Sequence, residues 1–195
     1  MQNQNLYDKY LHGRHWDFHP GIYAMYFADF LRRERLFKGL LVDLGCGSGA
    51  DVEIFARYGI NAMGVDYSQQ EVRAATMRYP QLRFEQQDME SLTFANDSIG
   101  SLYTVNVMHY VDQRRALAEM FRVLQPGGFV YVHFNEKIVD TATRHIDFSQ
   151  DYDEIMGLVS CFSSFHPRNQ LTTREDLVPV PHEHYIRELI LEKPQ

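Results

Sequence analysis

The feature that most constrains this chain is an apolar run that ends in three alternating glycines. Residues 40–44 are apolar apart from Asp43, as in a buried strand, and Gly45, Gly47 and Gly49 follow. Glycine lacks a Cβ, so the backbone can turn sharply there and a ligand can lie close against it. The next residues have a helical pattern, and free N–H groups at a helix start face whatever lies over it. We therefore expect the first strand, turn and helix of a nucleotide-binding α/β sheet.

The glycine turn matches the sequence fingerprint of dinucleotide-binding folds. Gly45, Gly47 and Ala50 match the fingerprint G-x-G-x-x-G/A. Asp66 lies about 20 residues further on, where an acid that binds a ribose belongs. These residues alone leave an NAD-type oxidoreductase open as an interpretation. Such an enzyme needs a separate substrate domain, and little of the chain remains for one.

Two details favour a different nucleotide. Asp43 lies two residues before the first glycine, where a carboxylate can meet a cationic amine, and Gly49 adds a third glycine. The stretch 43–49 resembles the first motif of class I S-adenosylmethionine (SAM)-dependent methyltransferases. The resemblance implies SAM as the cofactor and S-adenosylhomocysteine (SAH) as its product. The residues of this turn expected to bind it are Asp43, Gly45, Cys46, Gly47 and Gly49.

The next two predicted strands, residues 60–66 and 82–86, each have an acid at or just after their end. Asp66 ends the second strand, where its carboxylate can accept hydrogen bonds from both hydroxyls of an adenosine ribose. Tyr67 follows and can stack on the adenine. The alternative for Asp66 is an acid that serves the loop or caps the next helix. Asp88 and Met89 follow the third strand. The resemblance implies that Asp88 meets the adenine amino group and that Met89 lines the ring. From the sequence alone, Asp88 is equally a turn acid.

The later predicted elements follow the order of the same family. Residues 101–105 have the pattern of a fourth strand, a helix runs as far as Leu124, and residues 129–134 have the pattern of a fifth strand. The stretch 122–128 resembles the last motif of the family, so the resemblance covers roughly residues 40–134. It implies a doubly wound, mostly parallel, seven-stranded Rossmann-like sheet of order 3-2-1-4-5-7-6, with helices on both faces.

One domain accommodates the chain, because 195 residues suffice for a single full core. We divide it into an N-terminal cap of helices (1–38), a cofactor-binding core (39–135) and a C-terminal part (136–195). The C-terminal part is expected to hold a helix over 152–162 and an antiparallel hairpin. Pro167 is expected to interrupt the stretch between them.

The acceptor side of the site has candidates near both ends of the core. Methyl transfer from a sulfonium chiefly needs proximity and orientation, so it requires no nucleophile triad. Asn106 follows the fourth predicted strand and is expected to contact the cofactor at its transfer end. His109 is the candidate general base, because imidazole titrates near neutral pH; its alternative role is to shape the pocket. Further acceptor-side candidates are Tyr7, Tyr10, His15, Trp16 and Tyr110. The alternative for the N-terminal segment is packing of its rings on the sheet.

No metal site is expected. His12, His15 and His19 have the spacing of one helix face, but Gly13 and Pro20 weaken a helix there. No set of carboxylates or cysteines completes a site with these histidines.

Composition and charge limit the classes of partner and the cellular compartment that we expect for this chain. The chain has 26 acidic and 19 basic residues, a net charge of −7, which disfavours the phosphate backbone of nucleic acids. No apolar run approaches the ~20 residues needed to span a membrane, and the polar N-terminus has no signal-peptide pattern. The only cysteines are Cys46 and Cys161, which fits a reducing compartment, so we expect a cytoplasmic protein with Cys161 buried. A homodimer stays open, because a partner chain can complete an exposed acceptor site.

Together these features predict a SAM-dependent methyltransferase that acts on a small-molecule acceptor by in-line displacement. Residues 106–109 are not the Asn-Pro-Pro-Tyr type found in enzymes that methylate exocyclic amines of DNA bases or glutamine, and the Pro-Cys nucleophile of cytosine methylation is absent. The alternative is a catalytically silent SAM-binding module that regulates a partner.

Overall fold

The computed structural model describes residues 21–34, 36, 39–175 and 181–195, without the side chains of residues 164–175. The N-terminal candidates Tyr7, Tyr10, His15 and Trp16 lie outside the described residues. The helices are α2 (Ile22–Arg33), α3 (Ala50–Arg57), α4 (Gln69–Arg78), α5 (Gln113–Val123) and α6 (Tyr152–Leu158), with a 3-10 turn η2 (Met108–Tyr110). The strands are β1 (Leu41–Leu44), β2 (Ala62–Asp66), β3 (Arg83–Gln86), β4 (Ile99–Thr104), β5 (Leu124–Asp140), β6 (Ile146–Ser149), β7 (Ser163–Glu175) and β8 (His182–Glu192).

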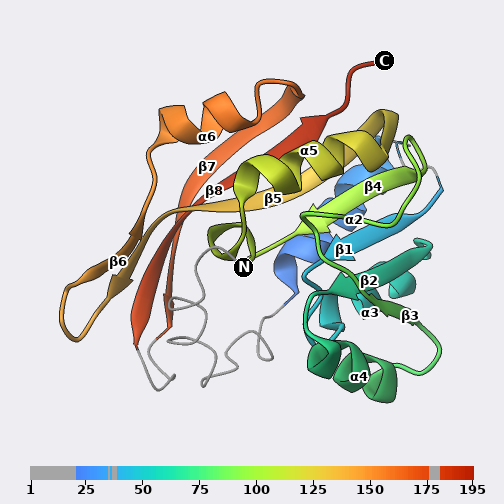
Figure 1. Cartoon of the computed structure of the whole chain (residues 1–195), viewed down its shortest axis with the longest axis horizontal. Coiled ribbons are helices and arrows are strands. Elements are labelled where there is room, and N and C mark those ends of the chain that lie inside the picture. The colour runs from blue at the N-terminus through green and yellow to red at the C-terminus, as the bar shows by residue number, and fades with distance from the viewer. Residues whose placement is uncertain (1–20, 35, 37–38, 176–180) are drawn as a thin grey trace.

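The strands form one sheet with helices on both faces (Figure 1). Their order is β3-β2-β1-β4-β5-β8-β7, with β6 paired to β5 off this path. The first five of these are parallel to their neighbours, and β8 runs antiparallel to both β5 and β7. With β6 left aside, this is the predicted doubly wound order 3-2-1-4-5-7-6, in which β8 is the seventh strand and β7 the sixth.

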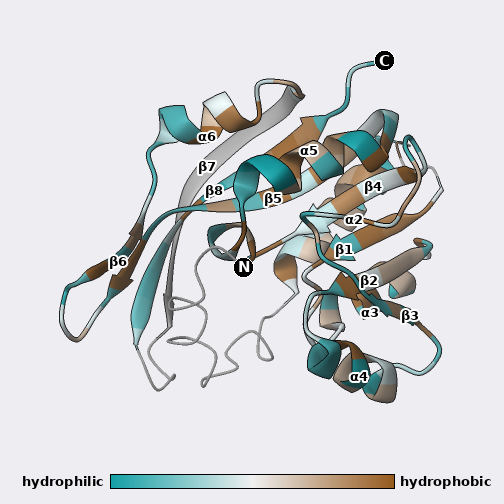
Figure 2. Ribbon diagram, in the orientation of Figure 1, coloured by the Kyte–Doolittle hydropathy of each residue, from teal (hydrophilic) through white to brown (hydrophobic). Residues whose placement is uncertain are grey.

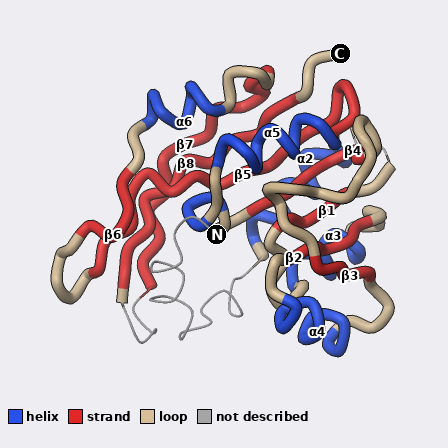
Figure 3. The backbone as a smooth tube through the Cα atoms, in the orientation of Figure 1, coloured by secondary structure: helices blue, strands red, loops and turns tan. Residues whose placement is uncertain are grey.

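β6 is an additional strand beyond the seven predicted, and it pairs with β5. It arises because β5 does not end near residue 134 but continues to Asp140 and folds back. The carboxylate of Asp140 accepts the N–H groups of Ala142 and Thr143 at 3.0 and 2.9 Å, which closes this turn. Figure 3 shows the long strands β5, β7 and β8 side by side, reaching out to β6.

Two apolar cores lie on opposite faces of the sheet because side chains alternate along each strand. Val42 and Leu44 of β1 pack into the core under α5 and α6. Leu41 packs into the core under α2 and α3. In Figure 2 hydrophobic residues dominate β1 and recur along the middle of β5. The alternation places the remaining β1 side chain, Asp43, on the α2–α3 face at the carboxyl end of the strand.

A cluster of buried aromatic rings joins the helices of that face to the sheet. Phe27 of α2 has no exposed surface, and its ring centroid lies 5.3 Å from that of Tyr131 on β5 and 6.2 Å from that of Tyr103 on β4. Phe55 of α3 packs edge-on against Tyr103 at 5.0 Å. The cluster fixes Tyr103, whose hydroxyl then reaches Asp51 in the first turn of α3.

Two smaller expectations are wrong. Pro167 does not interrupt the chain but lies within β7, where the pairing register with β8 shifts between Pro167 and Gln170. A proline is tolerated there because β7 is an edge strand with a bulge, so the missing N–H breaks no regular ladder. Cys161 is exposed rather than buried.

None of the helices in the described part of the chain combines the length and the apolar character that crossing a membrane requires.

Truncation of Phe27 tests the packing of α2. We expect Phe27→Ala to lower the free energy of unfolding by about 3–5 kcal/mol, because it leaves a cavity among fully buried rings. The control is Met25→Ala on the same helix, 45% exposed, for which a change within about 0.5 kcal/mol is expected. Urea unfolding measures both. Equal losses in the two variants would contradict the packing described here.

Candidate active site

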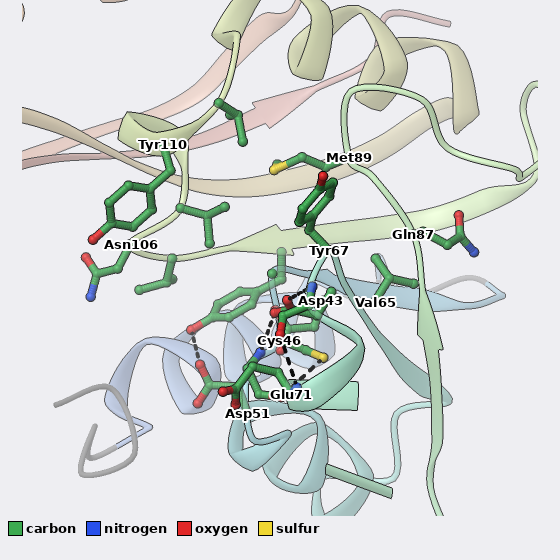
Figure 4. Close-up of a pocket in the computed structure, with 18 of the residues that line it drawn as sticks. Asp43, Cys46, Asp51, Val65, Tyr67, Glu71, Gln87, Met89, Asn106 and Tyr110 are labelled. Carbon is green, nitrogen blue, oxygen red and sulfur yellow. Dashed lines mark hydrogen bonds between the residues drawn. The ribbon is translucent and has the colours of Figure 1, made fainter. Parts of the chain in front are cut away.

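A pocket lies beyond the carboxyl ends of the parallel strands, where open α/β sheets bind ligands. Its wall is formed by the turns that follow β1, β2, β3 and β4, by the first turns of α3 and α4, and by one residue of β8 (Figure 4). The predicted site residues that line it are Asp43, Gly45, Cys46, Gly47, Asp66, Tyr67, Asp88, Met89, Asn106, His109 and Tyr110. The structure thus brings together residues that the sequence scatters over four turns.

The glycine turn is held by close packing as well as by its backbone conformation. Gly45 has φ 78°, and a Cβ there would lie 2.4 Å from Cγ2 of Val107. Gly49 has φ 82° and caps α3, and its Cβ would lie 2.6 Å from the ring of Phe84. Gly49 does not line the pocket. Its role in the structure is to let the start of α3 approach β3, which the sequence pattern did not distinguish from ligand binding.

Asp66 connects the turns after β1 and β2. Its Oδ2 accepts the N–H of Gly47 at 2.9 Å, and its Oδ1 accepts the N–H of Ser68 at 2.8 Å. Ser68 in turn caps α4, because its hydroxyl accepts the N–H of Glu71. Burial raises the pKa of the Asp66 carboxyl, and the hydrogen bonds from Ser68 and Gly47 act in the opposite direction.

The floor of the pocket is acidic. Asp43 is 3% exposed, and burial raises the pKa of its carboxyl well above the usual range, with Asp51 and Asp66 adding repulsion. Asp51 lies in the first turn of α3 and accepts the hydroxyl of Tyr103 at 2.9 Å. Glu71, the fourth acid, is 7% exposed. No lysine or arginine is among the described residues that line the pocket.

The thiol of Cys46 is not placed to act as a nucleophile. Its side chain is buried, and burial together with the negative charge of Asp43 raises the pKa of the thiol well above its usual value. The thiolate is the reactive form, so this environment disfavours reaction.

The adenine-side candidates lie on neighbouring turns. Tyr67 is 55% exposed at the pocket wall, which leaves its ring accessible for stacking. Asp88 lines the pocket and also accepts the N–H of Glu90 at 2.9 Å. Asp88 therefore holds the turn through its hydrogen bond to Glu90 and also lines the pocket.

Asn106 carries a buried polar atom that calls for an explanation. It has φ 60°, a left-handed conformation that asparagine tolerates better than most residues. Its Oδ1 is buried and has no hydrogen-bond partner among the described residues. Buried acceptors are normally satisfied, and this one lines the pocket, so a ligand donor is the natural partner. In Figure 4 Asn106 and Tyr110 lie on one side of the pocket and Gln87 on the other.

The end of the pocket beyond β4 combines apolar and imidazole side chains. Val105, Val107 and Val111 line it together with His109, which is 1% exposed. The rings of His109 and Tyr110 are 3.9 Å apart. This end is mostly apolar, unlike the acidic floor, and therefore suits a less polar ligand group.

The sequence analysis missed several residues of the wall. Those with ionisable or polar side chains are Ser48, Asp51, Ser68, Glu71, Gln87, Glu90, Tyr103 and His184. Asp51 and Glu71 had a local signal, because each lies in the first turn of a helix that follows a predicted turn. His184 had none, since pairing of β8 with β5 alone brings it to the pocket.

Comparison with known proteins agrees with this geometry. Residues 42–132 match the family described as "Methyltransferase domain". Over 101 residues the chain is 32% identical to a demethylmenaquinone methyltransferase of Paenarthrobacter aurescens, an overlap that covers 51% of this chain and 40% of the relative. It is 32% identical over 97 residues to a 2-methyl-6-phytyl-1,4-hydroquinone methyltransferase of Synechocystis, covering 47% of this chain and 30% of the relative. The matched segment therefore spans less than half of these two relatives.

Solved structures share the fold. A SAM-dependent methyltransferase of Methanosarcina mazei has a TM-score of 0.65 at 20% identity, covering 84% of this chain and 97% of its own. The geranyl diphosphate C-methyltransferase of Streptomyces coelicolor, solved with S-adenosyl-L-homocysteine, has a TM-score of 0.62 at 15% identity, covering 85% and 76%. The chain is thus similar to SAM-dependent methyltransferases, in sequence over residues 42–132 and in fold over most of its length.

The buried carboxyl of Asp43 predicts a pH-dependent stability difference. Its pKa is higher in the folded chain than the unfolded value of about 3.9. The folded state therefore holds the proton more tightly, and stability is lost as pH rises through the folded-state pKa. We expect Asp43→Asn to be more stable than wild type at pH 8, with the advantage shrinking as pH falls toward 4.

Urea unfolding of the ligand-free chain at a series of pH values measures this difference. The control is Asp153→Asn, the same chemical change at an exposed position of α6. A stability gain for Asp43→Asn that does not vary with pH, or a loss at pH 8, would show that Asp43 is not held with a raised pKa.

Proposed function

We propose that this chain transfers the methyl group of SAM to a small-molecule acceptor. The observation that carries the proposal is the acidic floor, in which Asp43, Asp51 and Asp66 lie close to the glycine turn and Asp43 is only 3% exposed. A ligand that brings positive charge relieves the repulsion within this cluster. SAM brings a sulfonium and an ammonium group, whereas the pyrophosphate of NAD brings negative charge to the same turn.

The residues present fit SAM. The unsatisfied Oδ1 of Asn106 can accept a hydrogen bond from an ammonium group. Each oxygen of Asp66 accepts one backbone N–H and keeps a second lone pair for a ribose hydroxyl. The exposed ring of Tyr67 can stack on adenine, with Asp88 and Met89 beside it in the wall.

The chemistry asks for positioning rather than for a protein nucleophile. When bound, SAM supplies a methyl group that is already activated on sulfur. The chain has to hold the donor and the acceptor in line and exclude water, and apolar side chains such as Val105 and Val107 serve that purpose at the acceptor end. His109, the candidate base, lies at the same end of the pocket.

A small molecule is the acceptor class that the observations favour. The relatives named above are methyltransferases of a demethylmenaquinone and of a phytyl hydroquinone, which are small apolar molecules. The net charge of −7 argues against nucleic acid. Both cysteines are free, which supports the proposed cytoplasmic location.

Label transfer separates an enzyme from a silent SAM-binding module. The chain is incubated with methyl-labelled SAM and a panel of phenols, hydroquinones, tertiary amines and thioethers, and products are identified by mass spectrometry. Labelled product with at least one acceptor supports the proposal. Binding of SAH without transfer to any acceptor would favour the silent module.

Asp66→Ala tests the proposed ribose contact. We expect the affinity for SAH to fall at least about tenfold, because charge-assisted hydrogen bonds contribute about 1.5–3 kcal/mol each. Calorimetric titration measures the dissociation constant, with Asp153→Ala as the exposed control that removes the same charge. Unchanged affinity in Asp66→Ala would contradict the ribose assignment. Because Asp66 also holds two backbone amides, a thermal melt checks that the variant is folded.

A further inference from the structure

Three buried side chains form a hydrogen-bonded chain at the acceptor end of the pocket. Nδ2 of Asn135, on β5, lies 2.7 Å from Nδ1 of His109, on η2. Oδ1 of the same amide lies 2.8 Å from Nδ1 of His184, on β8. The exposed fractions are 1% for His109, 0% for Asn135 and 4% for His184. Both histidines line the pocket, whereas Asn135 lies behind them.

The amide of Asn135 imposes opposite tautomers on the two rings. Its NH₂ end only donates and its carbonyl end only accepts. Nδ1 of His109 therefore accepts, so the neutral ring carries its proton on Nε2. Nδ1 of His184 therefore donates, so the neutral ring has its lone pair on Nε2. Rotating the amide would exchange the two roles, but it cannot make the two rings alike.

The two rings differ in their capacity to take a proton. His184 can be protonated on Nε2 and still donate from Nδ1 to Asn135. His109 already carries a proton on Nε2, and a second proton on Nδ1 would face the NH₂ group of Asn135. Within this arrangement His184 is the proton acceptor, and His109 is a neutral donor.

Neighbouring rings hold the pair in place. The ring centroid of His182 lies 4.7 Å from that of His184, at an interplanar angle of 67°. Tyr110 packs on His109 at 3.9 Å, and Phe148 of β6 lies 6.1 Å away on an edge. The additional strand β6 thus contributes to the wall around His109.

We propose that His184 is the base that accepts the proton of the methyl acceptor, with Asn135 as the residue that positions it. The inference rests on the proposed methyl transfer. The acceptor oxygen bonds to the methyl carbon while the C–S bond breaks and its electron pair stays on sulfur, and the hydroxyl proton passes to Nε2 of His184. The acceptor class is accordingly a hydroxyl compound with a dissociable proton, such as a phenol or hydroquinone. This moves the base from His109, the candidate from the sequence, to a residue on the last strand.

Nitrogen NMR of the imidazole rings tests the arrangement without an acceptor. The chain is labelled with ¹⁵N-histidine, saturated with SAH and measured at pH 8, and the rings are assigned with His109→Gln and His184→Gln. We expect His109 to carry Nε2–H and His184 to carry Nδ1–H. The same tautomer on both rings, or the reverse assignment, would overturn the inference.

Asn135→Asp provides a second spectroscopic test. A carboxylate accepts at both ends, so both rings of the variant are expected to carry Nδ1–H, a change that a merely structural role would not produce. If this buried substitution prevents folding, the wild-type spectrum alone still tests whether the two rings carry opposite tautomers. His145, on the exposed turn before β6, serves as the ring that the variant leaves unchanged.

The acceptor panel tests the catalytic part. We expect label on phenols or hydroquinones and not on tertiary amines or thioethers, which have no proton to lose. We expect His184→Gln to lower kcat about 100-fold or more with little change in the KM for SAM, and His145→Gln to leave both unchanged. Full kcat in His184→Gln, or equal methylation of proton-free acceptors, would overturn the base assignment. Failure of SAH to bind would instead refute the proposed function, whatever the tautomers.

Discussion

The site depends on the carboxylate of Asp66, which accepts backbone N–H groups from two different turns. One of its oxygens binds Gly47 in the turn after β1, and the other binds Ser68 at the start of α4. Both turns lie at the carboxyl ends of parallel strands. The N–H groups of Gly45 and Cys46 still bond to the carbonyl of Val65 on β2, and the Asp66 carboxylate extends this connection to Gly47 and Ser68. A single acid therefore sets the shape of the wall and remains available to the proposed ribose. A ligand that meets a carboxylate already held in place loses less conformational freedom on binding.

The acidic floor shows how binding and stability are linked in this chain. Asp43 is buried at the end of β1, and the charges of Asp51 and Asp66 add to the cost of its ionisation. An apolar residue at that position would fit the core better. Residues that break a local rule are expected at functional sites, and a buried carboxyl beside the glycine turn is such a residue. The hydroxyl of Tyr103, held by the aromatic cluster, fixes the orientation of Asp51.

Features with a local cause were predictable from the sequence. The glycine turn, the capping serine Ser68 and the strand that ends at Asp66 each have a signal within a few residues, and the strand order followed from the family resemblance. Features that depend on pairing between distant strands were not. β5 pairs with β8 as far as Asp140, and its far end also pairs with β6. The register between β5 and β8 places His184 opposite Ile138, where its ring reaches Asn135. No local pattern marks either residue.

Calorimetric titration of the wild-type chain with SAH, and separately with NAD, tests the central claim most directly. The claim is that the acidic floor and the glycine turn form a site for the cofactor of a methyltransferase. The account predicts saturable binding of SAH, one molecule per chain, and no measurable heat of binding for NAD. Binding of NAD without binding of SAH would contradict it, because a pyrophosphate would then occupy the turn beside Asp43.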